Sequence, residues 1–457
     1  MSLARHFEHA PAAKKKLYVK TYGCQMNVYD SACMERLMGH IGYESCDAPD
    51  DADMTILNTC HIREKAAEKM YSELGRINVI KSARKAQGKN MTVVVAGCVG
   101  QAEGEEIFAR APYVDAVVGP QSYHHLPDMI LGIERTAGRA INLDFDDAKF
   151  DKLPEETCLP EPGVAYVSIQ EGCDKFCSFC VVPYTRGAEY SRPLDAVMRE
   201  TMRGLALGAR EIVLLGQNVN AYHGAQPDKD APCNLGELIR HISALSGVER
   251  IRYSTSHPRD MHQALYDAHG NVPALIPFVS LPVQSGADAV LEAMNRKHDR
   301  NFYFSIVDKL RAKRPDAQFG SDFIVGFPGE TDADFNDTMD LVQRVGFIQG
   351  YSFKYSPRPG TPGAERSDQI SEEVKDARLQ ALQSLIMAQQ QAFAQSCVGK
   401  TMHVLLSKKG RKDGQLLGRT EFMQSAHVDN APDAWLGKVV PVEIIEACPN
   451  SLRAKAA

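Results

Sequence analysis

Three cysteines lie within one short stretch of the chain, EGCDKFCSFC, between residues 171 and 180. Cys173, Cys177 and Cys180 are separated by three and then two residues. A structural zinc site needs four ligands, and no histidine follows before His223 to complete one. Thiolates are soft ligands that suit iron–sulfur clusters. Because three of them leave one iron of a [4Fe–4S] cluster without a protein ligand, the stretch predicts a cluster that binds a small molecule at that iron.

Three further cysteines end apolar runs in the first hundred residues. LYVKTYGC ends at Cys24, MTILNTC at Cys60 and VVVAGC at Cys98. The segments between these runs carry apolar residues at helical spacing, so strands alternate with helices and a parallel sheet is expected. Because such strands end at one edge of the sheet, where ligands bind, we expect the three cysteines to hold a second cluster. Burial as small apolar side chains is the alternative, and Cys33 is the competing ligand.

Composition restricts the class of protein. The 457 residues suffice for two to three domains, and 44% hydrophobic with 24% charged residues is ordinary for a globular protein. The start lacks the apolar run of a signal peptide, and no stretch reaches the ~18 apolar residues of a membrane span. We therefore expect a cytoplasmic protein with no membrane association, whose thiols stay reduced. The remaining cysteines lack partners at ligand spacing and are predicted to be structural: Cys46, Cys158, Cys233, Cys397 and Cys448.

The expected fold class is α/β, with six successive segments. Six strand-like runs with helical spacers follow the first sheet, which suits a partial parallel barrel whose chemistry lies at the carboxyl ends of its strands. The last sixty or so residues switch to β character and suit a small β-barrel. The predicted boundaries are a flexible tail over 1–13, an α/β domain over 14–145, a linker over 146–160, a partial (β/α)6 barrel over 161–394, a small β-barrel over 395–450 and a tail over 451–457.

The spacing C-x3-C-x-Φ-C, in the loop after a first barrel strand, resembles the radical S-adenosylmethionine (SAM) superfamily. That resemblance implies that SAM binds the open iron and that the reduced cluster cleaves it to a 5′-deoxyadenosyl radical. YGCQMN, NTCHIREKA and AGCVGQ, followed by this loop and a C-terminal β module, are similar to the methylthiotransferases along nearly the whole chain. Four stretches resemble the branch of this family that acts on N6-(dimethylallyl)adenosine in tRNA: GCQMN, GCDKFCSFCVVPYTRG, LLGQNVNAY and LPVQSGADAVLEAMNRKH. A fifth stretch, GAEYSRP, departs slightly from the family's usual sequence.

The resemblance implies an activity, cofactors and partners. The activity is addition of a methylthio group to C2 of N6-(dimethylallyl)adenosine at position 37 of tRNA anticodon loops. The cofactors are two [4Fe–4S] clusters, with SAM as radical source and methyl donor. The partners are tRNA carrying isopentenyladenosine and a low-potential electron donor such as flavodoxin or ferredoxin, and we expect a monomer. Two alternatives remain: the same chemistry on threonylcarbamoyladenosine tRNA or a ribosomal-protein aspartate, and an electron carrier, which three-cysteine sets disfavour.

Polar residues at strand ends are the candidates for contacts to SAM or substrate. They are Gln217 and Asn218 after EIVLLGQN, Ser256 after RIRYSTS and Gln284 in LPVQSG. The resemblance implies that the backbone at Gly326, in GSDFIVGFPGE, approaches the adenine of SAM closely, and a simple barrel turn is the alternative. The sequence leaves Arg186, in PYTRG, without a decided role, because it can serve a substrate carboxylate, the tRNA backbone or SAM.

The C-terminal segment is basic on an otherwise acidic chain. The whole chain carries a net charge of −6, which gives no support for a strongly basic nucleic-acid-binding domain. From residue 395 onward, however, nine basic and six acidic side chains give a net charge of +3. The segment resembles a TRAM domain, a small RNA-binding barrel, which implies phosphate contacts from the turn SKKGRKDG. A solvated charged face is the alternative.

Overall fold

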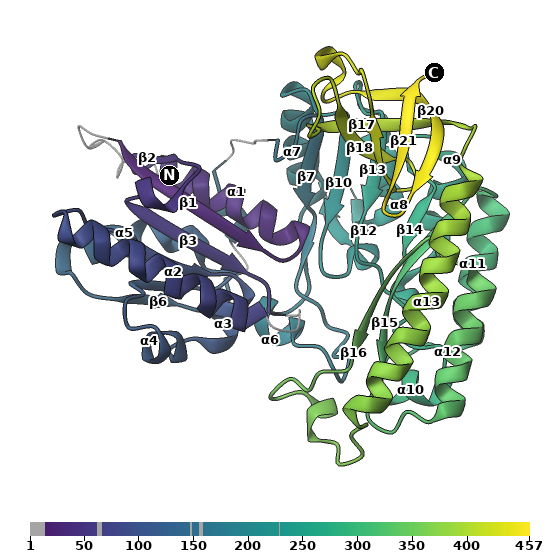
Figure 1. Cartoon of the computed structure of the whole chain (residues 1–457), viewed down its shortest axis with the longest axis horizontal. Coiled ribbons are helices and arrows are strands. Elements are labelled where there is room, and N and C mark those ends of the chain that lie inside the picture. Colours follow the sequence, from purple (N-terminus) through teal and green to yellow (C-terminus); the bar gives the residue numbers. More distant parts are fainter. Residues whose placement is uncertain (1–13, 62–65, 147–148, 155–158, 228) are drawn as a thin grey trace. The chain divides into compact units, whose positions relative to one another are not determined.

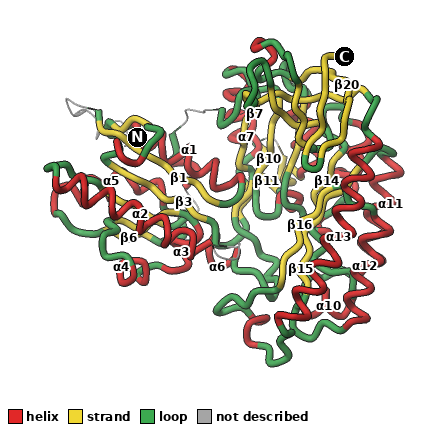
Figure 2. Tube along the Cα trace, viewed as in Figure 1, coloured by secondary structure: helices red, strands yellow, loops and turns green. Residues whose placement is uncertain are grey.

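The structure is a computed structural model, and it describes residues 14–61, 66–146, 149–154, 159–227 and 229–457. Figures 1 and 2 show the chain by sequence position and by secondary structure. The expected tail over 1–13, Cys158 and parts of the expected linker lie outside the described residues. The chain forms two compact units. We call residues 1–156 with 181–190 the N-terminal unit, and residues 157–180 with 191–457 the C-terminal unit.

The N-terminal unit is built on a six-stranded parallel sheet in the order β2-β1-β3-β4-β5-β6 (Figure 1). Strands β3 and β4 read as apolar runs because helices cover both faces of such a sheet. β1, β3 and β4, which precede the three cysteines of the first hundred residues, are direct neighbours. The strands are β1 (Lys15–Tyr22), β2 (Tyr43–Ser45), β3 (Met54–Thr59), β4 (Thr92–Ala96), β5 (Ala116–Val118) and β6 (Ala140–Asn142).

Helices and short turns complete this unit. They are α1 (Gln25–Gly39), α2 (Ala66–Ala86), α3 (Cys98–Glu103), α4 (Glu106–Arg110), α5 (Leu126–Thr136), α6 (Val182–Arg186), η2 (Pro49–Asp51), η3 (Tyr123–His125) and η4 (Lys149–Lys152). η4 lies within the expected linker over 146–160, and its Lys149 is buried with the ammonium 4.8 Å from the Tyr123 ring centre. Cation–π attraction and the apolar stem of lysine hold this part of the chain against the unit.

The C-terminal unit contains the predicted partial barrel of six parallel strands. Its sheets, β7-β10-β13 and β14-β15-β16, meet through a parallel bridge between Ile251 and Leu275. The predicted fold class is confirmed. The strands are β7 (Val164–Ser168), β10 (Glu211–Leu215), β13 (Arg250–Tyr253), β14 (Phe278–Ser280), β15 (Gln318–Val325) and β16 (Gln349–Lys354). The helices between them are α7 (Leu194–Ala206), α8 (Leu235–Ser243), α9 (Gln263–Asn271), α10 (Asp288–Ala293), α11 (Arg300–Lys313) and α12 (Asp332–Val345).

Short elements lie in the loops of this barrel. They are β8 (Gln170–Glu171), β9 (Tyr190–Ser191), β11 (His223–Gln226), β12 (Lys229–Asn234), η5 (Val219–Ala221), η6 (Pro258–Asp260) and η7 (Pro362–Glu365). β11 and β12 form an antiparallel hairpin, and their neighbour α8 begins with a capping box in which Asn234 and Glu237 satisfy each other's backbone N–H groups.

The long helix α13 (Glu372–Ser396) joins the two barrels of the C-terminal unit (Figure 1). It begins where the Ser371 side chain caps its first turn. Leu382 and Ile386 are buried in the core of the parallel barrel, and Phe393 packs against the core of the small barrel. Neither α13 nor any other helix within the described ranges has the length and apolarity to cross a membrane.

The small barrel is closed, in the order β17-β18-β19-β21-β20. Its elements are β17 (Thr401–Lys409), β18 (Leu416–Thr420), β19 (Ser425–Val428), η8 (Asp433–Trp435), β20 (Val439–Cys448) and β21 (Ser451–Ala456). The expected tail over 451–457 was therefore wrong: β21 pairs with both β19 and β20, and its Leu452 and Ala454 are buried. Two basic residues obscured this alternation: Arg453 lies between the two buried side chains, and Lys455 follows them.

The small barrel is also anchored to the parallel barrel through a buried arginine. The Arg250 guanidinium of β13 donates hydrogen bonds of 2.9 Å to the carbonyl oxygens of Arg419 and Thr420. Glu211 of β10 forms ion pairs with Arg250 at 3.1 Å and with Arg252 at 2.7 Å. A buried charge that is paired in this way is costly to displace, so the small barrel is held in one orientation within the C-terminal unit.

Candidate functional site

The turns that follow β1, β3 and β4 bring Cys24, Cys60 and Cys98 together. The Cys60 N–H donates a 3.0 Å hydrogen bond to the Tyr22 carbonyl, which places the first two turns side by side. Gly23, at φ +134°, is required there: a Cβ on it would lie 2.5 Å from the Cys60 Cβ. Only glycine permits such an approach with that backbone. The three turns therefore lie at one edge of the sheet, and a cluster held by the three cysteines stays a prediction.

The electrostatics favour the thiolate at Cys24 and oppose it at Cys98. A hydrogen bond from Cys60, together with the positive charge of Arg186, lowers the pKa of the Cys24 thiol to about 6, against the opposing effect of burial. Burial raises the pKa of the Cys98 thiol, and Arg186 opposes that rise through its charge and a hydrogen bond. Thiolates are the form that binds iron, and the Arg186 guanidinium favours that form at both Cys24 and Cys98.

A buried network of amides supports the same turns. The Cys24 thiol donates to the Asn27 Oδ1 at 3.2 Å, and the Asn27 amide donates to the Asn58 Oδ1 at 3.0 Å. Asn58 donates in turn to the Asn27 carbonyl at 2.8 Å and to the Ser31 hydroxyl at 2.9 Å. Satisfied buried amides fix one arrangement of the backbone. Asn27, the last residue of the Gln-Met-Asn stretch after Cys24, therefore helps to fix the turns that carry the cysteines. The sequence did not indicate this role.

Arg186, whose role the sequence left open, belongs to the N-terminal unit. Its Nη2 lies 2.7 Å from the Asp30 carboxylate of α1, and both side chains are almost fully buried. Its carbonyl accepts a 2.7 Å hydrogen bond from the Gln121 amide. The guanidinium is thus committed to a carboxylate of the chain and to the cysteine group rather than exposed to a substrate carboxylate.

Two further contacts hold the segment that carries Arg186 in place. Gly187 has φ +80°, and a Cβ on it would lie 2.8 Å from the Phe145 ring. The rings of Phe150 and Tyr190 stack with centroids 6.1 Å apart. Residues 181–190 follow the last cysteine of the EGCDKFCSFC loop in sequence, yet they pack as part of the N-terminal unit.

The competing ligand Cys33 has a different environment. It is fully buried on α1, and its sulfur accepts a 3.0 Å contact from the Arg36 guanidinium. The eleven cysteines within the described ranges are not joined in disulfides.

The loop with Cys173, Cys177 and Cys180 is held by the turn between α10 and α11. The Ser178 N–H and hydroxyl donate to the carbonyls of Met294 and Ala293, at 3.0 and 2.7 Å. The Asn295 amide donates to the Phe176 carbonyl at 2.9 Å. We call residues 293–296 the loop seat. The sequence stretch EAMNRKH carried the family resemblance, but nothing in its pattern indicated this contact across more than a hundred residues.

One predicted strand-end residue, Gln217, contacts this loop directly, and a second, Asn218, is connected to it through Asp260. The Gln217 Oε1 accepts a 2.7 Å hydrogen bond from the Gly172 N–H, and the Asn218 amide donates to Asp260 at 2.7 Å. Asp260 also pairs with Lys175 of the loop at 2.9 Å. The end of β10 therefore helps to position the cysteine loop.

Several polar atoms near the strand ends are buried without a hydrogen-bond partner among the described residues. They include the Asn218 Oδ1, the Ser256 Oγ and the His257 Nε2. Buried polar atoms rarely stay unsatisfied in native proteins. Their position after β10 and β13, close in sequence to the residues that hold the loop, fits a small polar ligand such as SAM. Asn218 and Ser256 were predicted, whereas His257 was not.

Gln284 and Gly326 lie at the ends of β14 and β15 but have structural roles of their own. Gln284, at φ +77°, donates its N–H to the Asp322 carbonyl at 3.0 Å. Gly326 has φ +71°, and a Cβ on it would lie 2.3 Å from the Lys375 side chain of α13. Packing of α13 thus already requires glycine at position 326, and its approach to SAM stays a prediction.

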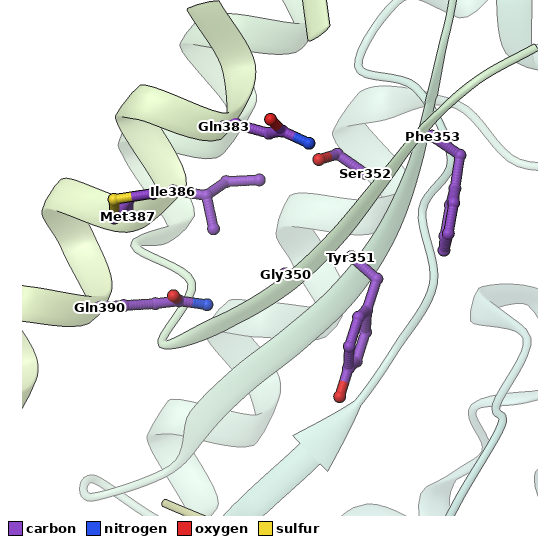
Figure 3. Close-up of a pocket in the computed structure, with 8 residues that line it drawn as sticks. All are labelled: Gly350, Tyr351, Ser352, Phe353, Gln383, Ile386, Met387 and Gln390. Atoms are coloured by element: carbon purple, nitrogen blue, oxygen red, sulfur yellow. The ribbon is translucent and has the colours of Figure 1, made fainter. Parts of the chain in front are cut away.

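A pocket of about 270 Å³ lies between β16 and α13 and contains none of the predicted site residues (Figure 3). Gly350 faces the helix, because a Cβ on it would lie 2.9 Å from Ile386. Tyr351 and Phe353 leave the strand on the side away from α13, as Figure 3 shows, and they are 56% and 45% exposed. Register places them beside Asp322 and Ile324 of β15, so these four residues share the inner face of the barrel.

Models of three families match successive parts of the chain. Residues 16–119 match the Uncharacterized protein family UPF0004, residues 167–342 the Radical SAM superfamily and residues 395–457 the TRAM domain. The last match includes β21, in agreement with the closed barrel.

Curated relatives are similar over nearly the full length. The tRNA-2-methylthio-N(6)-dimethylallyladenosine synthases of Rickettsia felis and Rickettsia bellii are each 58% identical over 440 residues, which cover 96% of this chain and 98% of the relative. That of Rickettsia rickettsii is 57% identical over the same length and shares.

Solved structures share the fold at low identity. The radical SAM methyltransferase TsrM from Kitasatospora setae superposes with a TM-score of 0.55 and 14% identity, covering 77% of this chain and 75% of that chain. The cobalamin-dependent SAM radical enzyme OxsB superposes with a TM-score of 0.53 and 10% identity, covering 81% of this chain and 56% of that chain.

Proposed function

Because the chain belongs to the family of tRNA-2-methylthio-N6-dimethylallyladenosine synthases, we infer that it is a radical SAM methylthiotransferase that modifies N6-(dimethylallyl)adenosine in tRNA. It uses SAM and [4Fe–4S] clusters. These cofactors, when bound, supply the one-electron and methyl-transfer chemistry for a C–H bond that no acid or base of the chain can ionise. The observation that carries the proposal is that one chain has two three-cysteine sets. One set follows three adjacent strands of a parallel sheet, and the other lies in a single loop.

We assign one cluster to each cysteine set. Cys173, Cys177 and Cys180 would hold the cluster that binds SAM, with Asn218 and Ser256 offering their unsatisfied oxygens to its polar groups. Cys24, Cys60 and Cys98 would hold the cluster on which sulfur is carried. The chain itself keeps the latter three thiols in one place through Gly23 and Asn27, and the C-terminal unit holds the cysteine loop on its seat.

For the substrate base, the inner face of β16 offers an apolar surface. Tyr351 and Phe353 are exposed there in spite of their large apolar area, and aromatic side chains are what stacks on splayed-out RNA bases. Phe353 lies beside Ile324, which packs against the same apolar cluster as Phe179 of the cysteine loop. We propose that the base and its dimethylallyl group rest on these two aromatic side chains, at position 37 of the anticodon loop.

An anticodon stem-loop that bears dimethylallyladenosine should be modified in preference to one with bare adenosine. Burial of the five added carbons is worth up to about 4 kcal/mol, at about 0.8 kcal/mol each, which corresponds to a preference of about 100-fold to 1,000-fold. The test is mass spectrometry of the nucleosides after reaction of the purified, reconstituted protein with SAM and reductant. Faster reaction of a threonylcarbamoyladenosine stem-loop or of a ribosomal-protein peptide would refute the substrate proposal.

The double variant Tyr351→Ala/Phe353→Ala tests the same surface from the protein side. It should lose most of the preference for the dimethylallyl group through a raised KM for the modified stem-loop. Cleavage of SAM without tRNA should persist, because both residues lie on β16 and not in the cysteine loop. Phe302→Ala, which removes another exposed aromatic side chain of this unit, is the matched control. An unchanged preference in the double variant would place the base elsewhere.

The basic turn of the small barrel is proposed to contact the tRNA backbone. Lys408 and Lys409 are paired with Glu161 and Asp433, whereas Arg411 and Lys412 are exposed and have no ion pair among the described residues. Arg411→Ala/Lys412→Ala should therefore weaken tRNA binding and reduce its log–log salt slope by about 1.5, since each phosphate contact contributes somewhat less than one. Filter binding at several salt concentrations measures the slope.

The control removes the same charge elsewhere in that barrel. Arg453 and Lys455 are engaged with Glu446 and Glu443, so Arg453→Ala/Lys455→Ala should change the slope much less. Equal changes in both double variants would show that net charge, and not the turn, attracts the tRNA.

The electron donor, the place of action and the oligomeric state are further proposals. The one-electron step requires a low-potential donor such as a flavodoxin or ferredoxin, and the tRNA substrate favours the cytoplasm as the place of action. We propose that the chain acts as a monomer, because both cysteine sets and the basic barrel are present on a single chain.

A further inference from the structure

Arg296 of the loop seat is a buried cation beside a cysteine of the loop. Its side chain belongs to a residue only 5% exposed, and its Nη1 lies 3.5 Å from the Cys177 sulfur. Its Nη2 donates to the Pro282 carbonyl at 2.5 Å, and its Nε is buried without a hydrogen-bond partner within the described ranges. Neither acceptor is a carboxylate.

Arg296 differs in this respect from two other buried arginines of the chain. Arg186 is paired with Asp30 and Arg250 with Glu211, whereas the Arg296 guanidinium contacts the Cys177 sulfur and the Pro282 carbonyl and forms no ion pair within the described ranges. Burying an unpaired charge costs several kcal/mol. The fold tolerates this cost only if a negative group completes the environment of the guanidinium.

The positive charge of Arg296 affects the pKa of two histidines, His298 and His257. Burial and the positive charge of Arg296 lower the pKa of the His298 imidazole to about 4. Burial and Arg296 also lower the pKa of His257. Both imidazoles are therefore neutral near pH 7 and add no positive charge to that of Arg296.

The negative group that fits is the cluster itself. Three thiolates outweigh the positive charge of an iron–sulfur core, so the bound cluster is an anion, and one-electron reduction makes it more negative. A fixed cation and an N–H directed at a ligand sulfur stabilise the reduced state more than the oxidised state, which is how proteins set the potentials of such clusters. The electron comes from the low-potential donor, and no proton is required.

We propose that Arg296 is a positioning residue that serves as the counterion of the cluster bound by Cys173, Cys177 and Cys180 and raises its midpoint potential. The loop seat then has two functions: Ala293, Met294 and Asn295 hold the backbone of the loop, and Arg296 makes the cluster easier to reduce. This inference rests on the proposed assignment of that cluster.

The test is a redox titration of the reconstituted full-length protein, followed by electron paramagnetic resonance without SAM. It is made in the wild-type background and in Cys24→Ala/Cys60→Ala/Cys98→Ala, where only the loop cluster contributes. Arg296→Met should lower the midpoint potential by about 59 mV. At a fixed potential, this shift makes the ratio of reduced to oxidised cluster about tenfold smaller for a one-electron couple. Arg296→Lys, which keeps the charge, should retain most of the wild-type value.

Controls separate the possible failures. Arg300→Met removes a nearby arginine that pairs with Asp337 and not with the loop, and it should leave the potential unchanged. An unchanged potential in Arg296→Met, with iron intact and a raised Kd for SAM, would show that Arg296 serves SAM and would overturn the inference. Equal losses in Arg296→Met and Arg296→Lys would likewise refute a role for the charge. Retention of all iron in Cys173→Ala/Cys177→Ala/Cys180→Ala would instead refute the cluster assignment.

Discussion

Replacing Cys24, Cys60 and Cys98 with alanine should abolish the methylthio product and leave SAM cleavage to 5′-deoxyadenosine nearly intact. The reason is the separation of the two cysteine sets between the two compact units. Iron content should fall by about half, from about eight to about four per chain, since each [4Fe–4S] cluster holds four. Iron analysis and mass spectrometry of both products measure the effect.

Cys33→Ala is the matched control, because it removes another buried cysteine of the same unit. It should keep the full iron content and the full yield of methylthio product. If the triple variant still turned over product, the N-terminal cysteines would not carry the transferred sulfur. If Cys33→Ala lost half of the iron, the ligand set would have to include α1.

Replacing Arg186 with methionine should destabilise the N-terminal cluster while SAM cleavage persists. The change leaves Asp30 buried without its partner, which costs about 3–5 kcal/mol, and it removes the cation that favours thiolates at Cys24 and Cys98. We expect lower thermal stability, loss of up to half of the iron and little methylthio product. Calorimetry and iron analysis on the same preparation provide the measurements.

The double variant Arg186→Met/Asp30→Leu distinguishes the two effects. Replacing a buried ion pair with apolar side chains is often neutral for stability, so the fold should recover. The cluster should not, because the cation is still missing. Recovery of iron and of product in the double variant would mean that Arg186 acts only by stabilising the fold.

The cysteine groups were predictable from the sequence for a topological reason. Successive parallel strands end at one edge, so a cysteine after each of β1, β3 and β4 is brought to one place by local patterns alone. The three-cysteine loop needed no fold at all, because its ligands lie close together in sequence. In both cases the information is local, and a periodic pattern or a short spacing carries it.

The arginines were not predictable, because their roles come from contacts between distant segments. Arg186 meets Asp30 across 156 positions, and Arg296 meets Cys177 across 119. No periodicity links such pairs. The strands β2 and β21 were also hard to predict from the sequence. β2 is a short edge strand and β21 closes the small barrel, and both have few buried residues. They are defined by pairing with other strands and not by a pattern of their own.

The central claim, that this chain installs the methylthio group on dimethylallyladenosine in tRNA, is tested most directly in cells from which its gene is deleted. The measurement is mass spectrometry of nucleosides from total tRNA, with the wild-type gene returned as control. The account predicts loss of 2-methylthio-N6-dimethylallyladenosine and accumulation of N6-dimethylallyladenosine, both reversed by the returned gene. An unchanged amount of the methylthio nucleoside in the deletion strain would contradict it.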